Sequence, residues 1–300
     1  MKVLVPGADG FVGRHLVRAL QARGDVVEAC AGPGSAGSLE ITDAAAVLER
    51  IESFTPEGIV HLAGISSVAW SHQHPERTHR VNVGGTANLL DAVRKAAPRA
   101  RVLLVGSGEE YGPPETVPTT EDAALRPQNP YAVSKASSGL VARFYADAHG
   151  LRVIHARAFN HSGPGQKPIY AIANFATQIA RGLREGQDVI RIGTGNLDTR
   201  RDFTDVRDVV RAYRTLAAHG EPGVFNICSG VTHSARELVA ALGEVAGVAI
   251  DHQVDPAKVR AHEVHEIRGA NDHLTAATGW RPEIPLETTL RDTLAWWRQT

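Results

Sequence analysis

Short apolar runs alternate with amphipathic stretches along the first half of the chain. Apolar residues recur at helical spacing between the runs, as at Leu16, Val17 and Leu20. Strands that alternate with helices predict an α/β fold built on a doubly wound parallel sheet. The runs that we interpret as buried strands are residues 2–5, 25–30, 58–64 and 102–105.

The second half of the chain continues this pattern less regularly, and we expect two lobes that interleave along the sequence. The main lobe would be a Rossmann-type domain that contains this sheet, and a smaller C-terminal lobe would accompany it. Further elements are expected as a helix at 77–97, a strand at 151–156, a helix at 206–219 and a strand at 224–227. The predicted lobes are residues 1–160 plus about 205–230, and about 161–204 plus 231–300.

Composition narrows the class of protein. Thirty-two basic residues balance thirty-three acidic ones, which gives no electrostatic reason to expect binding to nucleic acid or to a membrane surface. The only cysteines, Cys30 and Cys228, form no disulfide framework and suit a reducing compartment. No apolar run is long enough to cross a membrane, and a strand that begins at Lys2 leaves no room for a signal peptide. We therefore expect a cytoplasmic protein.

Glycines at positions 7, 10 and 13 separate the first predicted strand from the first predicted helix. Glycines allow a tight turn, close approach of a pyrophosphate and close packing of helix on strand. The helix N-terminus that follows offers free N–H groups to the phosphates. This spacing is common by itself, but its place between strand and helix predicts a dinucleotide site.

A ribose-binding acid is expected at the end of the second strand in such a site. Cys30, Ala31 and Gly32 stand there, and none of them is acidic. A 2′-phosphate would meet no repulsion, so we predict NADP(H) as the cofactor, with NAD(H) not excluded. Arg14 is the candidate partner for the 2′-phosphate.

The segment that ends in Tyr131-x-x-x-Lys135 carries the candidate chemistry. Asn129 is a good N-cap and Pro130 suits the first turn, so a helix should begin here with Tyr131 and Lys135 on one face. Unit charges about 4 Å apart at an effective dielectric near 20 interact by roughly 4 kcal/mol, which would lower the pKa of the phenol, although burial opposes this. Ser107 would hold a substrate oxygen against that phenol. The alternative is a half-buried aromatic ring and a solvated lysine.

These motifs together resemble the extended short-chain dehydrogenases/reductases: the glycine turn, His61-Leu62-Ala63-Gly64, Ser107 and Tyr131-x-x-x-Lys135. The resemblance implies that Ser107, Tyr131 and Lys135 are catalytic, that Lys135 also binds the nicotinamide ribose, and that Asn82 supports them. The cofactor site implied by the resemblance consists of Gly7, Asp9, Gly10, Phe11, Val12, Gly13, Glu40, Ile41, Leu62, Ala63, Gly64, Tyr131 and Lys135.

Two later segments resemble nucleotide-sugar enzymes of the same family, which implies that the smaller lobe binds the nucleotide sugar and the main lobe NADP(H). They are the loop at 157–166, which ends in Gly163-Pro164-Gly165-Gln166, and the segment at 193–206, which contains Arg201-Asp202-Phe203-Thr204-Asp205-Val206. The planar fork of arginine pairs with two diphosphate oxygens. The substrate-binding residues implied by the resemblance are Ser107, Asn160, Arg201 and Arg260.

The resemblance is strongest to reductases of GDP-4-dehydro-6-deoxy-D-mannose. It implies NADPH-dependent reduction of the C4 ketone of a nucleotide-linked 4-keto-6-deoxyhexose, with GDP-D-rhamnose as the product and Tyr131 as the proton donor. An NDP-sugar 4,6-dehydratase of the GDP-mannose type is the first alternative, in which Glu109 would take the C5 proton. An NDP-hexose 4-epimerase is the second. A non-catalytic NADP(H) sensor is a remote third, because the catalytic residues are all present.

The sequence also bears on metal binding and on self-association. The sequence His262-Glu263-Val264-His265 lacks the spacing of the HExxH zinc motif, and we expect no metal site. Leu140, Val141 and Phe144 give the helix that carries Tyr131 an apolar outer face. In the family such helices pair across a two-fold axis, so the resemblance implies a homodimer.

Overall fold

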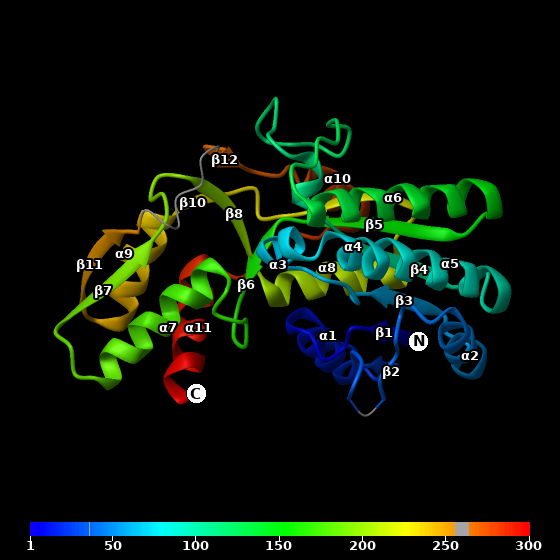
Figure 1. Cartoon of the computed structure of the whole chain (residues 1–300), viewed down its shortest axis with the longest axis horizontal. Helices are drawn as coiled ribbons and strands as arrows, with labels where there is room; N and C mark the ends of the chain where they lie inside the picture. Colours follow the sequence, from blue (N-terminus) through cyan, green and yellow to red (C-terminus); the bar gives the residue numbers. More distant parts are fainter. Residues whose placement is uncertain (36, 256–263) are drawn as a thin grey trace.

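The computed structural model describes residues 1–35, 37–255 and 264–300 (Figure 1). Within these residues, six parallel strands form the main sheet in the order β2-β1-β3-β4-β5-β9. The chain runs from β1 outward to β2 and then returns to β3 on the other side of β1. This reversal confirms the predicted α/β class with a doubly wound, Rossmann-type sheet. The strands are β1 (Lys2–Pro6), β2 (Val26–Cys30), β3 (Gly58–His61), β4 (Arg101–Ser107), β5 (Arg152–Ala158) and β9 (Gly223–Ile227).

Helices cover both faces of this sheet, and each face has its own apolar core. Leu16 and Leu20 of α1 pack with Val209 and Tyr213 of α8 beneath one face. Leu89 and Val93 of α5 belong to the core on the other face, together with residues of α2 and α6. The helices are α1 (Phe11–Ala22) and α8 (Val206–His219) on the first face, and α2 (Ala44–Phe54), α5 (Gly85–Ala96) and α6 (Pro130–His149) on the second.

The single helix expected at 77–97 is divided into three parts. A π-helical turn, η1 (Arg80–Gly84), separates α4 (Pro75–His79) from α5, and α3 (Val68–Gln73) precedes them. The carbonyl of Asn82, inside this turn, accepts hydrogen bonds from the hydroxyls of Thr86 at 2.7 Å and Ser138 at 3.0 Å. These hydroxyls satisfy a backbone group in the widened turn, a feature often found at functional sites.

A smaller lobe lies on the left in Figure 1 and contains the C-terminus. In it β8 pairs with β6, β10 and β12, and β7 pairs with β11. Helices α7, α9 and α11 enclose a separate apolar core. The elements are β6 (Asn160–Ser162), α7 (Ala171–Arg184), β7 (Val189–Thr194), β8 (Arg200–Asp205), β10 (Thr232–Ser234), α9 (Ala235–Ala246), β11 (Ala249–Val254), β12 (Glu266–Ile267) and α11 (Leu286–Gln299). Helix α10 (Asp272–Thr278) instead lies beside β9, and its Leu274 belongs to a core of the main sheet.

The segments therefore cross between the lobes more than once. β8 belongs to the small lobe, α8 packs beneath the main sheet, and β9 pairs with β5. This supports the interleaved division, whose boundaries remain a prediction. None of the helices in the described ranges is both long and apolar enough to span a membrane.

Candidate active site

Ser107 was expected just past the fourth strand, but β4 runs two residues beyond the expected 102–105, and Ser107 is its last residue. Ser107 also caps a short 3₁₀ helix, η2 (Gly108–Tyr111). Its hydroxyl accepts a hydrogen bond from the N–H of Glu109 at 3.2 Å and lies close enough to the phenol of Tyr131 to act on its pKa. The predicted partners Ser107 and Tyr131 therefore lie together at the carboxyl end of the sheet, where ligands bind in folds of this type.

Tyr131 stands in the first turn of α6, which begins as expected. Asn129 caps the helix through a hydrogen bond to the N–H of Ala132 at 2.8 Å, and Pro130 occupies the first position. The N–H of Tyr131 donates to the hydroxyl of Ser71 at 3.2 Å. The backbone of the first turn is thus fixed on two sides, which orients the Tyr131 side chain.

The electrostatics of Tyr131 differ from the sequence expectation. Burial raises the pKa of Tyr131 well above its ordinary value, although the Ser107 hydroxyl acts to lower it. The charge of Lys135 does not offset this effect of burial, and its Nζ donates to the carbonyl of Val105 at 2.8 Å. Burial also lowers the pKa of Lys135 to about 8. The prediction of an acidified phenol was wrong, and Tyr131 is protonated at neutral pH.

Asn82 connects the segment after β3 to α6, the helix that carries Tyr131 and Lys135 and is called the catalytic helix below. Its Oδ1 accepts from the N–H of Ile65 at 2.8 Å, and its Nδ2 donates to the carbonyl of Ile65 at 3.0 Å and to the hydroxyl of Ser134 at 2.8 Å. A Cβ at Gly64 would lie 2.9 Å from Asn82 Oδ1 and 3.8 Å from Lys135 Nζ. The predicted residues Gly64, Asn82 and Lys135 are therefore neighbours.

The glycine turn lies against the segment that follows β3. Gly7 has a φ of +86°, and a Cβ there would lie 2.6 Å from the backbone nitrogen of Ala63. A Cβ at Gly13 would lie 2.3 Å from the carbonyl oxygen of Gly7. Only glycine fits either position. The predicted cofactor segments 7–13 and 62–64 thus form one cradle, which fits a dinucleotide.

A carboxylate does lie at the end of β2, although none occurs there in the sequence. Asp9 of the glycine turn accepts a hydrogen bond from the N–H of Gly32 at 3.0 Å. The side chain of Arg14 donates to the carbonyl of Asp9 at 2.7 Å and contacts that of Gly165 at 3.4 Å. Sequence analysis missed the position of Asp9 because the residue lies far from β2 along the chain.

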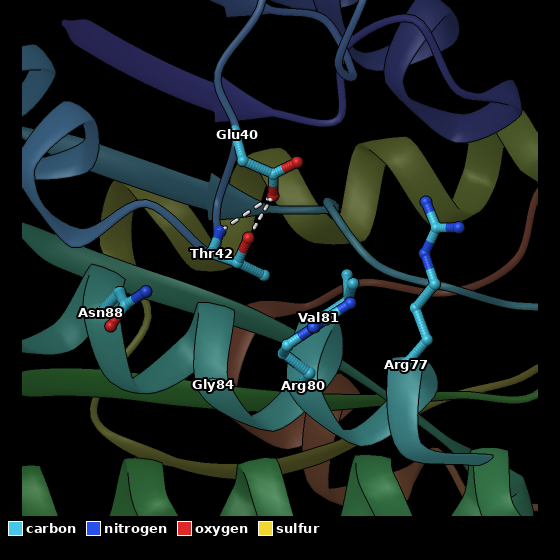
Figure 2. Close-up of a pocket in the computed structure, with 7 residues that line it drawn as sticks. All are labelled: Glu40, Thr42, Arg77, Arg80, Val81, Gly84 and Asn88. Atoms are coloured by element: carbon cyan, nitrogen blue, oxygen red, sulfur yellow. Dashed lines mark hydrogen bonds between the residues drawn. The ribbon is translucent and has the colours of Figure 1, made fainter. Parts of the chain in front are cut away.

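Glu40 faces an open cavity of about 430 Å³. Figure 2 shows Glu40 and Thr42 on one side of it and the helix that carries Arg77 and Arg80 on the other. The Glu40 carboxylate accepts from the N–H of Thr42 at 3.0 Å and from its hydroxyl at 2.8 Å. The side chain of Ile41 is buried, and a Cβ at Gly85 would lie 2.7 Å from it. The two arginines were not among the predicted residues.

The predicted substrate residues come from several elements. Glu109 accepts a hydrogen bond from the Nδ2 of Asn129 at 3.1 Å, which holds its carboxylate at the start of α6. Asn160 begins β6 and is exposed. Arg201, on β8, donates to the carbonyls of Arg200 at 2.8 Å and Val264 at 2.9 Å. Arg260 lies outside the described residues.

One contact near the site was not anticipated. The hydroxyls of Ser66 and Tyr170 are 3.0 Å apart and join the loop after β3 to the segment before α7. Tyr170 lies close enough to Tyr131 to act on its pKa. Across the described ranges, no group of three or more His, Cys, Asp or Glu side chains is arranged to hold a metal ion.

Comparisons with known proteins agree with this geometry. A family model described as GDP-mannose 4,6 dehydratase matches residues 35–293. GDP-6-deoxy-D-mannose reductase of Pseudomonas aeruginosa is 37% identical over 299 residues, which cover 99% of this chain and 97% of the relative. UDP-glucose 4-epimerase of Mycolicibacterium smegmatis is 31% identical over 314 residues, 99% of each chain. The structure of RMD from Pseudomonas aeruginosa complexed with NADPH has a TM-score of 0.89 and 34% identity, and 99% of each chain is covered.

A doubly wound sheet with a glycine cradle and with serine, tyrosine and lysine at its carboxyl edge defines the class, which is an NAD(P)-dependent short-chain dehydrogenase/reductase. Within that class, relatives include reductases, dehydratases and epimerases of nucleotide sugars. The chain belongs to the GDP-mannose 4,6-dehydratase family of these enzymes.

Proposed function

We propose that this chain uses NADPH to reduce the C4 ketone of a nucleotide-linked 4-keto-6-deoxyhexose. The substrate that the relatives favour is GDP-4-dehydro-6-deoxy-D-mannose, and the product is GDP-D-rhamnose. The observation that carries the proposal is a half-buried, protonated Tyr131 whose phenol lies close enough to Ser107 for that residue to act on its pKa. A reductase needs this arrangement, because the ketone oxygen must receive a proton as it gains negative charge.

The proposed mechanism assigns one task to each residue. When bound, the reduced nicotinamide supplies the hydride that forms the new C–H bond at C4. Tyr131 transfers its phenolic proton to the C4 oxygen, and the Ser107 hydroxyl donates a hydrogen bond to the same oxygen. The Lys135 ammonium stabilises the phenolate that remains on Tyr131 until solvent returns a proton.

The glycine cradle would hold the dinucleotide. A Cβ at Gly7 or Gly13 would clash with neighbouring backbone and prevent this close turn. Gly10, Phe11 and Val12 open α1 and would present backbone N–H groups to the pyrophosphate. NADP(H) is the proposed cofactor, in line with the NADPH complex of RMD, and NAD(H) is the alternative. On the substrate side, Asn160 would contact the sugar or its diphosphate, and Arg201 and Arg260 would bind the diphosphate.

A 4,6-dehydratase is the second candidate, and the position of Glu109 favours it specifically. Its carboxylate is held by Asn129 at the start of the helix that carries Tyr131, where it could take a proton from the sugar. A dehydratase regenerates its own dinucleotide, as does a 4-epimerase. Either enzyme would convert its substrate with no net consumption of NADPH.

The test is incubation of the purified protein with GDP-4-dehydro-6-deoxy-D-mannose and either NADPH or NADH. We expect the absorbance of the reduced nicotinamide to fall in proportion to product, and the product to be GDP-D-rhamnose. Parallel incubations test the two alternatives: GDP-mannose is the substrate for dehydratase activity, and UDP-glucose is the substrate for epimerase activity. Conversion of either one without added NADPH, together with no reduction of the keto sugar, would refute the proposal.

We also propose that two copies pair through α5 and α6 in the cytoplasm. Leu140 and Phe144 on α6 are 63% and 60% exposed, which is unusual for such apolar side chains. Cys30 and Cys228 are both buried and, in the described part of the chain, both free, as a reducing compartment favours. Light scattering should give the mass of a dimer for the natural chain and of a monomer for Leu140→Glu with Phe144→Glu. A natural chain that is monomeric at working concentration would contradict the pairing.

A further inference from the structure

Glu110 is a fully buried carboxylate directly beside the catalytic serine. One of its oxygens, Oε1, accepts a hydrogen bond from the backbone N–H of Ser107 at 2.8 Å. The other, Oε2, accepts from the Nε of Arg157 at 3.0 Å. The Nε2 of His155 lies 3.2 Å from Oε1. Because a buried charge is costly unless it is paired and hydrogen-bonded, this carboxylate occupies a site built to hold it.

Two glycines leave room for the carboxylate and the imidazole. A Cβ at Gly106 would lie 2.4 Å from Glu110 Oε1 and 2.3 Å from His155 Nε2. A Cβ at Gly139 would lie 2.4 Å from the Cε1 of His155. Gly106 belongs to β4 and Gly139 to α6, one helical turn after Lys135. The pair of Glu110 and His155 therefore lies between the strand that carries Ser107 and the helix that carries Lys135.

Arg157 extends this network away from the site. Its Nη1 donates to the hydroxyl of Tyr111 at 3.0 Å, and that hydroxyl donates to the Oδ1 of Asn226 at 2.7 Å. The network links β4, β5 and β9, so the Glu110 carboxylate is held from several elements at once. A rigidly held acceptor in turn fixes the Ser107 N–H that it binds.

We propose that Glu110 is a positioning residue for the reaction: it fixes the backbone of Ser107 and supplies the buried negative charge that keeps the Lys135 ammonium charged. The kinetic part of this inference rests on the proposed reductase function. The charge part concerns the protein alone and can be measured without any substrate.

The electrostatics of the neighbouring groups agree with this role. Burial acts to raise the pKa of Glu110, but His155, Arg157 and the Ser107 N–H outweigh it and lower that pKa, so Glu110 is ionised at neutral pH. Burial lowers the pKa of Lys135 to about 8, and the charge of Glu110 acts to raise it. The other titratable or charged groups around Glu110 are Glu109, Tyr111, Glu121, Tyr131, His155 and Arg157.

Two substitutions separate the two tasks. Glu110→Gln keeps the length of the side chain and an oxygen for the Ser107 N–H, but it removes the charge. Glu110→Asp keeps the charge, but it is one methylene shorter and cannot reach the same N–H. The control is Asp208→Asn, which likewise removes the charge of a buried carboxylate. That carboxylate accepts hydrogen bonds from the backbone N–H groups of Glu283 at 2.9 Å and Ile284 at 2.8 Å.

The direct readout is the titration of Lys135. The chain has five lysines, so ¹³C-labelled lysine gives few NMR signals, and Lys135→Arg identifies the signal of Lys135. We expect a midpoint near pH 8 in the natural chain, in Glu110→Asp and in Asp208→Asn. In Glu110→Gln the midpoint should fall by roughly one pH unit, because the negative charge that favours the ammonium is gone.

The kinetic readout uses the same proteins. Glu110→Asp should lower kcat by roughly tenfold or more with little change in KM, because a misplaced Ser107 misaligns the reacting groups. Glu110→Gln should lower kcat for a different reason: near pH 8 a smaller fraction of Lys135 carries its charge. Asp208→Asn should keep kcat. An unchanged Lys135 midpoint in Glu110→Gln, or a natural kcat in Glu110→Asp, would overturn the proposal. If Glu110→Gln fails to fold because Arg157 loses its partner, the kcat of Glu110→Asp still decides the Ser107 part.

Failure of the reductase function itself would be seen in the natural chain. The keto sugar would then not be reduced at all, while the Lys135 titration would still report on the charge of Glu110.

Discussion

Lys135 donates a hydrogen bond from its Nζ to the carbonyl of Val105 at 2.8 Å, and this bond ties the catalytic helix to the strand that ends at Ser107. The ammonium lies in a half-buried position, where its partial removal from water favours loss of its charge. A lysine that must stay charged to support Tyr131 therefore sets an upper pH limit for the reaction.

This limit gives the first prediction. Burial lowers the pKa of Lys135 to about 8 from its ordinary 10.5, so the active ammonium form is present below pH 8 and is lost as the pH rises through that value. The plot of kcat against pH, measured from about pH 6 to about pH 10, should fall on its alkaline side near pH 8. A rate that stays constant to about pH 10 would contradict this role for Lys135.

Tyr131→Phe tests the proton donor. The change removes only the phenolic oxygen, so the keto-sugar oxygen no longer receives a proton, and kcat should fall by about 10²- to 10⁴-fold. The dissociation constant for NADPH, measured by fluorescence, should change little. Tyr145→Phe on the outer part of the same helix is the matched control and should keep its activity. Substantial turnover by Tyr131→Phe would exclude Tyr131 as the donor.

Asp9 allows a prediction about cofactor preference. Its carboxylate binds the N–H of Gly32 just beyond β2, where an adenosine ribose is expected, and a negative charge there opposes a 2′-phosphate. Asp9→Asn should therefore raise the ratio of kcat/KM for NADPH over NADH by about tenfold, or about 1.4 kcal/mol. Asp91→Asn, at a surface carboxylate on α5, should leave the ratio unchanged. A ratio that stays constant or falls in Asp9→Asn would place the ribose elsewhere.

The buried side chain of His61 should make the free energy of unfolding depend on pH. Burial, aided by the charge of Lys135, lowers the pKa of His61 to about 3 from its ordinary 6.5. Between these values the unfolded chain binds a proton that the folded chain does not, so stability is lost as the pH falls below 6.5. The free energy of unfolding should drop by about 3 kcal/mol between about pH 6.5 and about pH 4 from this group.

Denaturant titrations of His61→Gln provide the comparison. The variant has no group that titrates at this position, so its acid-induced loss of stability should be smaller than that of the natural chain by this amount. Equal losses in the two proteins would show that His61 is not the buried base responsible.

Much of the main fold follows from local patterns in the sequence. Helix α8 has the predicted bounds because its apolar residues keep helical spacing from Val206 to Leu216. The start of α6 follows from the cap at Asn129 and the proline after it. The glycine turn was recognisable because its spacing and its place between strand and helix both point to the same structure.

The remaining features depend on contacts between distant segments. The π-helical turn around Asn82 requires the hydroxyl of Ser138 from another helix. Asp9 reaches the end of β2 only in the folded chain. The direction of the Tyr131 pKa depends on burial, which no local spacing reports. Glu110 is adjacent to Glu109 in sequence, and nothing in that pair indicates that one carboxylate is buried beside His155.

The most direct test of the proposed function follows a labelled hydride. NADPH carrying deuterium at the reactive position of the nicotinamide is incubated with the protein and GDP-4-dehydro-6-deoxy-D-mannose, and the sugar nucleotide is analysed by NMR. We predict one deuterium at C4 of the product for each NADPH consumed. A product without deuterium at C4, or conversion of the sugar with no consumption of NADPH, would contradict the reductase function.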